Sequence, residues 1–189
     1  MKVLALLAAA SIAVAVPTPQ QDPPHIPPED LIWPAETYRY WVKTGETELD
    51  PISGLVQKNG NQDEEITTLV NFQFPEELEG RTCRLRFDLW ERDTSEGSKR
   101  ADVFTSLAPE GFSIASEAVW PPGNKRDVHV GRIIANAPGS AVWEQQYHGF
   151  PEFPCPAGRV LGGEFVGVGD KDKIEWDIGV TGPRIEVLE

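Results

Sequence analysis

Apolar and polar residues alternate over two neighbouring runs in the middle of the chain, joined by a short acidic connection. The second run, residues 82–89, places four apolar side chains on one face: Cys83, Leu85, Phe87 and Leu89. Its other face carries Thr82, Arg84, Arg86 and Asp88. Successive side chains of a strand point to opposite faces, so Cys83 is expected to point inward. Two alternating runs around a short turn predict a β-hairpin over residues 70–92.

Short alternating runs separated by turn residues continue along most of the chain. Asn59 with Gly60, and residues 121–124 and 169–172, are typical turn sequences. No segment keeps a sustained helical period. We therefore expect residues 35–189 to form a single all-β domain, a two-sheet antiparallel β-sandwich of roughly eight to ten short strands.

The N-terminus has the composition of a secretory signal. Lys2 precedes an apolar run over residues 3–14, which is too short to span a bilayer, and Ala13 and Ala15 form a small-residue cleavage site. Residues 1–15 are thus predicted to be a signal peptide; the length of the run disfavours a membrane anchor. Residues 16–34 follow as a leader or linker whose prolines exclude helices and central strands. These prolines are Pro17, Pro19, Pro23, Pro24, Pro27, Pro28 and Pro34.

The charge balance narrows the classes of partner. Seventeen Lys and Arg residues stand against thirty Asp and Glu residues, for a formal net charge of −13. Phosphate backbones and anionic membrane surfaces are bound through clustered basic side chains, so neither nucleic acid nor a membrane is an expected partner. No second long apolar run follows the signal, and we expect a secreted protein without stable membrane insertion.

The chain has two cysteines, Cys83 and Cys155. In an oxidising compartment two inward cysteines pair, so a structural disulfide is expected. The alternatives are two buried thiols or a catalytic or metal-binding role. The chain has no Cys-x-x-Cys motif that would favour the latter.

Two local patterns resemble the But-two C-terminal domain family of fungal, largely secreted proteins. The first is Phe72-Gln73-Phe74-Pro75, Leu78, Gly80-Arg81-Thr82-Cys83, Leu85 and Phe87. The second is Phe153-Pro154-Cys155-Pro156-Ala157-Gly158 followed by Glu164-Phe165, with Glu175-Trp176 near the end. Arg81 stands where the family usually has lysine. The resemblance implies a compact β-rich domain with paired cysteines and no established enzymatic activity, and it supplies no catalytic residues.

Tryptophans are the candidate binding residues. The chain has six tryptophans, and those on polar strand faces or near turns are Trp41, Trp90, Trp120 and Trp143. Flat exposed tryptophans on a β-sandwich can stack on sugar rings. The alternative is packing in the core or at its edges, where aromatic side chains are common.

Carboxylates are the candidate catalytic residues. Glu175 and Asp177 fall on one face of a strand, and Glu164 is expected on a neighbouring strand. Glycosidases place two carboxylates on either side of the bond they cleave. The alternative is a solvated strand face, which an acidic chain readily produces. A copper site would need two histidines, a cysteine and usually a methionine, and Met1 belongs to the signal, so no metal or cofactor is expected.

Together these patterns predict a secreted, non-catalytic β-sandwich with an extracellular or cell-wall interaction role. Exposed tryptophans would favour polysaccharide as its ligand. A glycoside hydrolase-like enzyme and a protein-binding secreted effector are the alternatives.

Overall fold

The computed structural model describes residues 28–61, 64–106 and 126–188. The expected signal peptide, most of the proline-rich segment and Trp120 lie outside these residues. The described chain is mostly strand, with the short 3-10 helices η1 and η3. In chain order the elements are η1 (Pro28–Asp30), β1 (Leu31–Ile32), β2 (Glu36–Trp41), β3 (Thr47–Leu49), β4 (Ser53–Lys58), β5 (Ile66–Gln73), η3 (Glu76–Leu78), β6 (Thr82–Leu89), β7 (Thr94–Gly97), β8 (Arg100–Ser106), β9 (Arg126–Ile134), β10 (Gly139–Ser140), β11 (Val142–Gln146), β12 (Glu152–Pro154), β13 (Val160–Gly167), β14 (Asp172–Asp177) and β15 (Gly182–Leu188).

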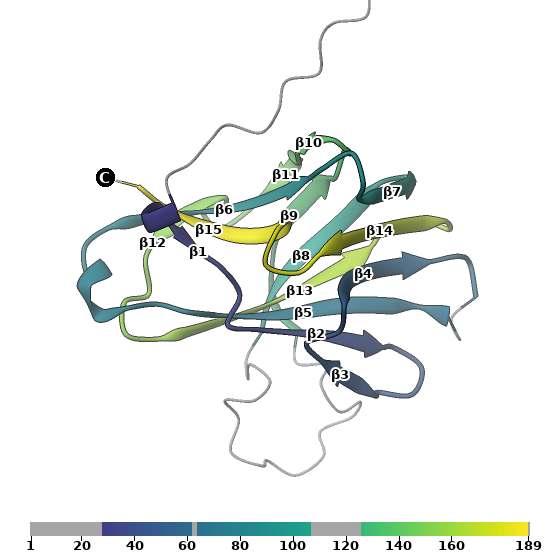
Figure 1. Cartoon of the computed structure of the whole chain (residues 1–189), viewed down its shortest axis with the longest axis horizontal. Helices are drawn as coiled ribbons and strands as arrows, with labels where there is room; N and C mark the ends of the chain where they lie inside the picture. The colour runs from purple at the N-terminus through teal and green to yellow at the C-terminus, as the bar shows by residue number, and fades with distance from the viewer. Residues whose placement is uncertain (1–27, 62–63, 107–125, 189) are drawn as a thin grey trace, which may run out of the picture.

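The strands form two antiparallel sheets (Figure 1). In the small sheet β15 pairs with β1 on one side and with β6 from Thr82 to Asp88 on the other. The large sheet has ten strands in the order β11-β9-β8-β13-β5-β4-β14-β7, with β2 on β5 and β3 on β2. The all-β sandwich is confirmed. Ten strands have five or more residues, and five shorter ones (β1, β3, β7, β10 and β12) are too brief to show an alternating pattern.

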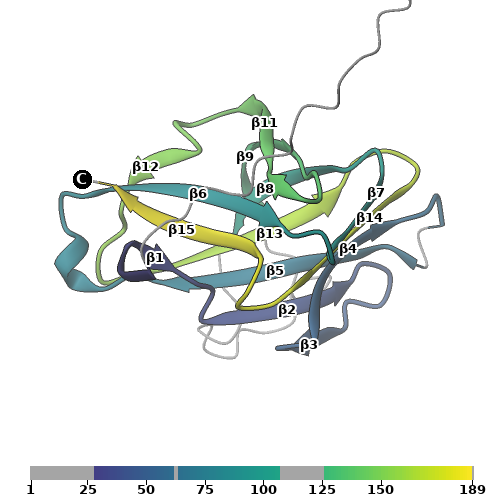
Figure 2. The same ribbon diagram turned by 45° about the horizontal axis from the view of Figure 1, so that its top comes forward.

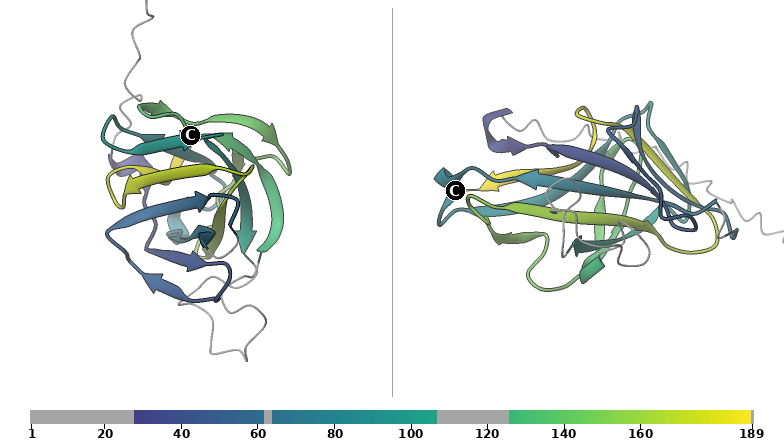
Figure 3. Two further views of the ribbon diagram at one scale, coloured as in Figure 1. Left: turned by 90° about the vertical axis from the view of Figure 1, so that its right-hand side faces the viewer. Right: turned by 90° about the horizontal axis from the view of Figure 1, so that it is seen from below.

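The core fills the space between the two sheets. Phe87 of β6 contacts Phe165 of β13 and Trp176 of β14, with ring centroids 5.4 and 5.1 Å apart. Figure 2 shows β6 and β15 side by side, on one side of β5 and β13 of the large sheet. The end-on view in Figure 3 shows both sheets curving around this shared interior. The inward face expected for β6 is confirmed, because Cys83, Leu85, Phe87 and Leu89 are all buried.

The predicted hairpin over residues 70–92 is wrong. β5 pairs with β13, β2 and β4 in the large sheet, whereas β6 pairs with β15, β10 and β12 in the small one. Pro75 has no N–H to continue the ladder, and η3 together with Gly80 at φ +80° turns the chain toward the opposite sheet. The two alternating runs therefore face each other across the core instead of pairing edge to edge.

The sandwich begins upstream of residue 35. Leu31 and Ile32 form β1, which pairs with Glu186 and Ile185 of β15. The guanidinium of Arg184 lies 5.2 Å from the ring centroid of Trp33. The end of the segment assigned above to the proline-rich leader is thus part of the small sheet.

The chain between β9 and β13 changes sheets repeatedly. β10 pairs with β6 in the small sheet, β11 pairs with β9 at the edge of the large sheet, and β12 pairs with β6 again. Because β15 occupies one edge of β6 from Thr82 to Asp88, β10 and β12 both lie along its other edge. They pair with opposite ends of β6, and this leaves a gap between them.

Gly54 and Gly182 leave room for the Trp176 ring because glycine has no side chain. A Cβ at Gly54 would lie 2.2 Å from the Trp176 ring, and one at Gly182, where φ is +85°, would lie 2.1 Å from it. We expect Gly182→Ala to lower the free energy of unfolding by about 1–3 kcal/mol through overpacking, beyond the cost of the positive φ. The matched control is Gly179→Ala, at φ +76° with nothing within 4 Å of its Cβ. Urea denaturation of both variants measures the difference; equal losses would contradict the packing role of Gly182.

Candidate functional site

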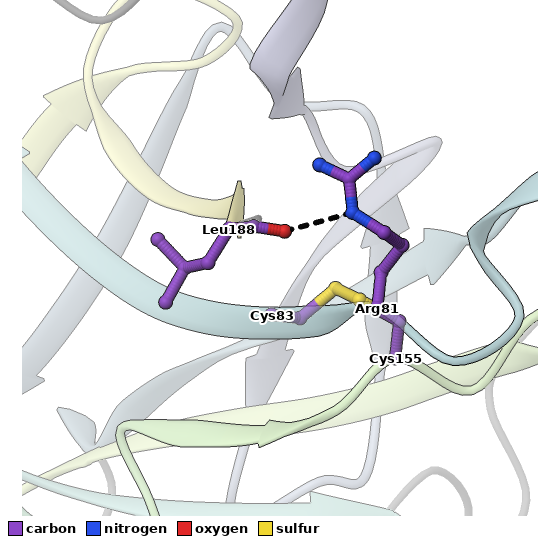
Figure 4. Close-up of a disulfide and its surroundings, with 4 residues drawn as sticks. All are labelled: Arg81, Cys83, Cys155 and Leu188. Atoms are coloured by element: carbon purple, nitrogen blue, oxygen red, sulfur yellow. Dashed lines mark hydrogen bonds between the residues drawn. A yellow bond between two sulfur atoms is a disulfide. The ribbon is translucent and has the colours of Figure 1, made fainter.

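The two cysteines form a disulfide that joins β6 to the segment after β12. The Cys83–Cys155 bond has an S–S distance of 2.04 Å and a Cα–Cα distance of 5.1 Å, and both residues are buried. Next to it the main chain of Cys155 donates to the Arg81 carbonyl at 3.0 Å, and Arg81 Nε donates to the Leu188 carbonyl at 2.9 Å (Figure 4). The expected disulfide is confirmed. Neither cysteine is a thiol that could attack a substrate or bind a metal.

The candidate tryptophans within the described residues do not form a row. Trp41 ends β2, Trp90 follows β6 and Trp143 lies on β11, and these three strands are not paired with one another. Only Trp90 is exposed, and the guanidinium of Arg92 lies 5.2 Å from its ring centroid. Trp41 and Trp143 are half-buried. A planar stacking platform of several tryptophans is therefore not formed by these residues.

Glu175 and Asp177 do share one face of β14, as expected, but each has a cationic neighbour. Lys173 Nζ lies 2.8 Å from Glu175, and Ser53 Oγ donates to Glu175 at 2.8 Å. The hydrogen bond from Lys173 is the largest cause that lowers the pKa of Glu175, and Ser53 adds to it. Asp177 forms a salt bridge with Arg92 at 2.8 Å on the surface. This pattern is typical of a solvated strand face.

Glu164 does not face this pair. It is buried on β13, where Arg126 Nε and Nη2 donate to its two oxygens at 2.7 and 2.8 Å and Thr67 Oγ1 donates at 2.7 Å. Burial, followed by the charge of Glu164, raises the pKa of the nearby Tyr40 hydroxyl. β13 pairs with β5 and β8, whereas β14 pairs with β4 and β7. The predicted pairing of Glu164 with Glu175 or Asp177 across a cleft is therefore wrong for the described structure.

The gap along β6 contains a pocket of about 160 Å³. β12 pairs with β6 only as far as Arg84, and β10 pairs only with Asp88 and Leu89. Over residues 85–87 the edge makes two loop contacts instead, from Leu85 N–H to the Pro151 carbonyl and from Ala141 N–H to the Phe87 carbonyl. The pocket is lined by Arg84, Leu85, Arg86, Phe87, Asp88, Ser140, Ala141, Trp143 and Pro151.

Trp143 brings an aromatic wall to this pocket from the other sheet. It lies on β11 of the large sheet. The chain leaves the small sheet after β10, forms β11 and returns to the small sheet at β12. Its ring packs against Gly131 of β9, where an added Cβ would come within 2.8 Å of the ring. The backbone of β9 therefore covers part of the ring.

Charged side chains alternate across β12, β6 and β15 beside the pocket. Arg84 donates to Glu152 at 2.6 Å and to Glu186 at 3.2 Å. Arg86 donates to Glu186 at 3.3 Å, to Asp88 at 3.4 Å and to Ser140 Oγ at 3.2 Å. Arg184 donates to Asp88. Three guanidiniums and three carboxylates therefore balance, and the network is electrically neutral in a strongly acidic protein.

Asp88 is the most deeply buried member of this network. Its side chain is 0% exposed; Oδ2 accepts from Arg184 and Arg86, while Oδ1 has no hydrogen-bond partner. Burial lowers the pKa of Arg184, although the charge of Asp88 opposes that shift. Arg184 Nε, in the same ion pair, is likewise buried without a partner. Unpartnered buried polar atoms are rare in proteins, and neither of these two has surface that a ligand could contact.

The sequence pattern placed Arg84, Arg86 and Asp88 on one face of their strand but did not single them out. The available signal is the alternation of Arg184 and Glu186 on β15. Glu186 lies directly opposite Arg84, whereas Arg184 lies opposite Arg86 and donates to Asp88, two residues further along β6. The break in pairing that opens the pocket has no comparable signal, because β10 and β12 are only two and three residues long.

No three His, Cys, Asp or Glu side chains among the described residues are grouped so that they could hold a metal ion. None of the helices in the same residues has the length and apolar character needed to cross a membrane. In comparisons with known proteins, the chain matches no family model and no curated protein.

Proposed function

We propose that this chain is a secreted, non-catalytic β-sandwich of the But-two type that binds extracellular or cell-wall polysaccharide. The carrying observation is the pocket at the gap in β6, where Trp143 stands beside Arg84, Arg86, Asp88 and Ser140. A sugar ring has apolar faces and a rim of hydroxyl groups. An aromatic wall next to planar, charged hydrogen-bonding groups complements both parts.

Secretion is supported by the N-terminal pattern and is compatible with the buried disulfide, since such bonds persist in oxidising compartments. The two But-two patterns come from β5–β6 and from the segment around β12, and Cys83–Cys155 joins them. A pair of bonded cysteines is what the family resemblance implies.

The hydrolase alternative has less support. Catalysis by a carboxylate pair requires two groups facing one bond, one of them able to give up a proton. Glu164 is held by Arg126 and Thr67, and Glu175 by Lys173 and Ser53. The protein-binding alternative is favoured by one observation, the exposure of Leu49, Ile52 and Val180 on β3 and two loops.

Binding is tested by depletion of the mature protein from solution with insoluble wall polysaccharides, with reducing-sugar release measured in the same tubes. We expect depletion without release. Trp143→Ala removes the aromatic wall and is expected to weaken binding at least about tenfold, equivalent to about 1.4 kcal/mol. Trp90→Ala is the matched control, because Trp90 is exposed outside the pocket.

Two results would contradict the proposal. Absence of depletion by every polysaccharide would remove the binding function, and release of reducing sugar would remove its non-catalytic character. An equal loss for Trp143→Ala and Trp90→Ala would move the binding site away from the pocket.

A further inference from the structure

We infer that the pocket at the gap in β6 recognises a sugar that carries a carboxylate, a uronic acid residue, through the guanidinium of Arg84. This inference rests on the proposed function and names the class of saccharide that its site binds. It follows from three features of the pocket: an exposed arginine with unused N–H groups, an ion-pair partner of that arginine that a ligand can replace, and an aromatic wall for the sugar ring.

Arg84 is the more accessible of the two arginines that line the pocket. Its side chain is 36% exposed, compared with 13% for Arg86. A guanidinium has five N–H groups and no acceptor. Arg84 makes three hydrogen bonds, two to Glu152 and one to Glu186, so at one N–H for each bond two N–H groups remain. A carboxylate uses such groups better than a hydroxyl does, because both partners are then ionised and the two hydrogen bonds can be parallel.

Glu152 is the partner of Arg84 that a ligand can replace. Arg84 Nε and Nη2 both donate to the same oxygen, Glu152 Oε1, at 3.1 and 2.6 Å. The Glu152 side chain is 51% exposed, and exposed ion pairs contribute little to stability. A ligand carboxylate that offers one oxygen to each nitrogen forms the two-point contact that arginine and carboxylate groups often make. The exchange therefore improves the geometry and releases Glu152 into solvent.

The other contacts of Arg84 hold its guanidinium in place during this exchange. Arg84 Nη1 donates to Glu186 at 3.2 Å, and Glu186 also accepts from Arg86 at 3.3 Å. The Glu186 side chain is only 16% exposed. Arg86 is tied in turn to Ser140 Oγ at 3.2 Å. The group that receives the ligand is thus oriented in advance, which lowers the entropic cost of binding.

Trp143 complements the ring of the same sugar. Its indole lines the pocket together with Arg84, so a sugar ring can lie against the indole while its carboxylate reaches the guanidinium. Aromatic rings offer an apolar surface to the C–H groups of a sugar face. Stacking alone does not distinguish a neutral sugar from a uronic acid. The preference between them is therefore assigned to Arg84.

The charge balance around the pocket permits an anion to bind there. Three guanidiniums face three carboxylates, and a ligand carboxylate that takes the place of Glu152 keeps this balance. The whole chain carries a formal charge of −13, which repels an anion at long range. Salt at about 0.15 M screens that repulsion over about 8 Å. The contact with Arg84 therefore governs the preference for a short acidic saccharide.

The test measures binding of galacturonic acid trimer and of its methyl ester by isothermal titration calorimetry at neutral pH and about 0.15 M salt. The ester keeps the sugar backbone and removes the charge. We expect the free acid to bind at least about tenfold more tightly. Equal or tighter binding of the ester overturns the carboxylate preference and leaves saccharide binding standing. If neither trimer binds while a neutral wall polysaccharide depletes the protein, the inference fails and the proposed function stands. If nothing binds in either assay, both fail.

Replacement of Arg84 tests its role in the preference. Arg84→Met removes the guanidinium, so the acid and the ester should bind with equal affinity. Arg100→Met is the matched control, because Arg100 makes a similar surface contact with Glu144 away from the pocket and should keep the tenfold preference. A preference that survives Arg84→Met, or that Arg100→Met also abolishes, overturns the assignment to Arg84.

A second variant tests the exchange without removing the guanidinium. Glu152→Gln weakens the competing ion pair at an exposed position. The free acid should bind at least about threefold more tightly to this variant, whereas the affinity for the ester should not change. Glu144→Gln is the matched control at the surface pair with Arg100. Unchanged binding of the acid by Glu152→Gln, or an equal gain in the control, contradicts the exchange.

Discussion

Replacing Arg126 with methionine is expected to lower the free energy of unfolding by about 3–5 kcal/mol. Arg126 Nε and Nη2 donate to both oxygens of Glu164, which is 1% exposed. Methionine fills a similar volume but leaves the carboxylate buried with only Thr67 as a hydrogen-bond donor. A buried charge that loses its counter-ion is costly because no water replaces the lost interaction. The hydrogen bonds and charge of Glu164 together raise the pKa of Arg126 even though burial opposes this.

Urea denaturation followed by circular dichroism measures this loss. The double variant Arg126→Met/Glu164→Leu should recover most of it, because two apolar residues pack where the ion pair was. Arg100→Met is the matched control, since Arg100 makes an equally close two-point contact with Glu144 at the surface and should cost at most about 1 kcal/mol. If the two single variants lose the same stability, burial does not govern the Arg126–Glu164 pair.

Removal of the disulfide is the second large effect. The cysteines are 72 residues apart, so the loop-closure model assigns the bond about 4 kcal/mol of stability, and Cys83→Ala/Cys155→Ala should lose about that much. The effect arises mainly because the open chain gains conformations in the unfolded state. Thermal and urea denaturation of the double variant measure it.

Reduced wild-type protein provides the control for the disulfide. Its unfolding free energy should match that of the double variant to within about 1 kcal/mol, because both lack the same cross-link. Both sulfurs are bonded to each other, so the native oxidised protein has no thiol at either position and should not take up a thiol-reactive label. Unchanged stability of the double variant, or label on either cysteine of the native protein, contradicts a structural bond.

The faces of the strands could be predicted from the sequence, but their partners could not. Alternation over residues 82–89 is a local property, and it correctly placed Cys83 and Phe87 in the core. Whether β5 lies beside β6 or across from it depends on η3 and on competition from β13 and β15, which lie about a hundred residues further along the chain. Proximity in sequence was therefore a misleading guide to pairing.

The residues of the candidate site could likewise be predicted only in part from the sequence. Tryptophans and carboxylates were selected by residue type, and of these only Trp143 lines the pocket. Arg86 and Asp88 belong to the site because two very short strands stop on either side of them. The length of a strand of two or three residues is set by the rest of the fold, and no local pattern encodes it.

The pairing of β1 with β15 has a mechanical consequence. The two strands run antiparallel, so residues 31 and 186 lie opposite each other at the same end of the sandwich. A force pulling these ends apart would load the ladder one hydrogen bond at a time, first between β1 and β15 and then between β15 and β6. Such peeling resists force far less than shear, in which all bonds of a ladder share the load. The 72-residue segment closed by Cys83–Cys155 would remain as a loop that tension cannot extend.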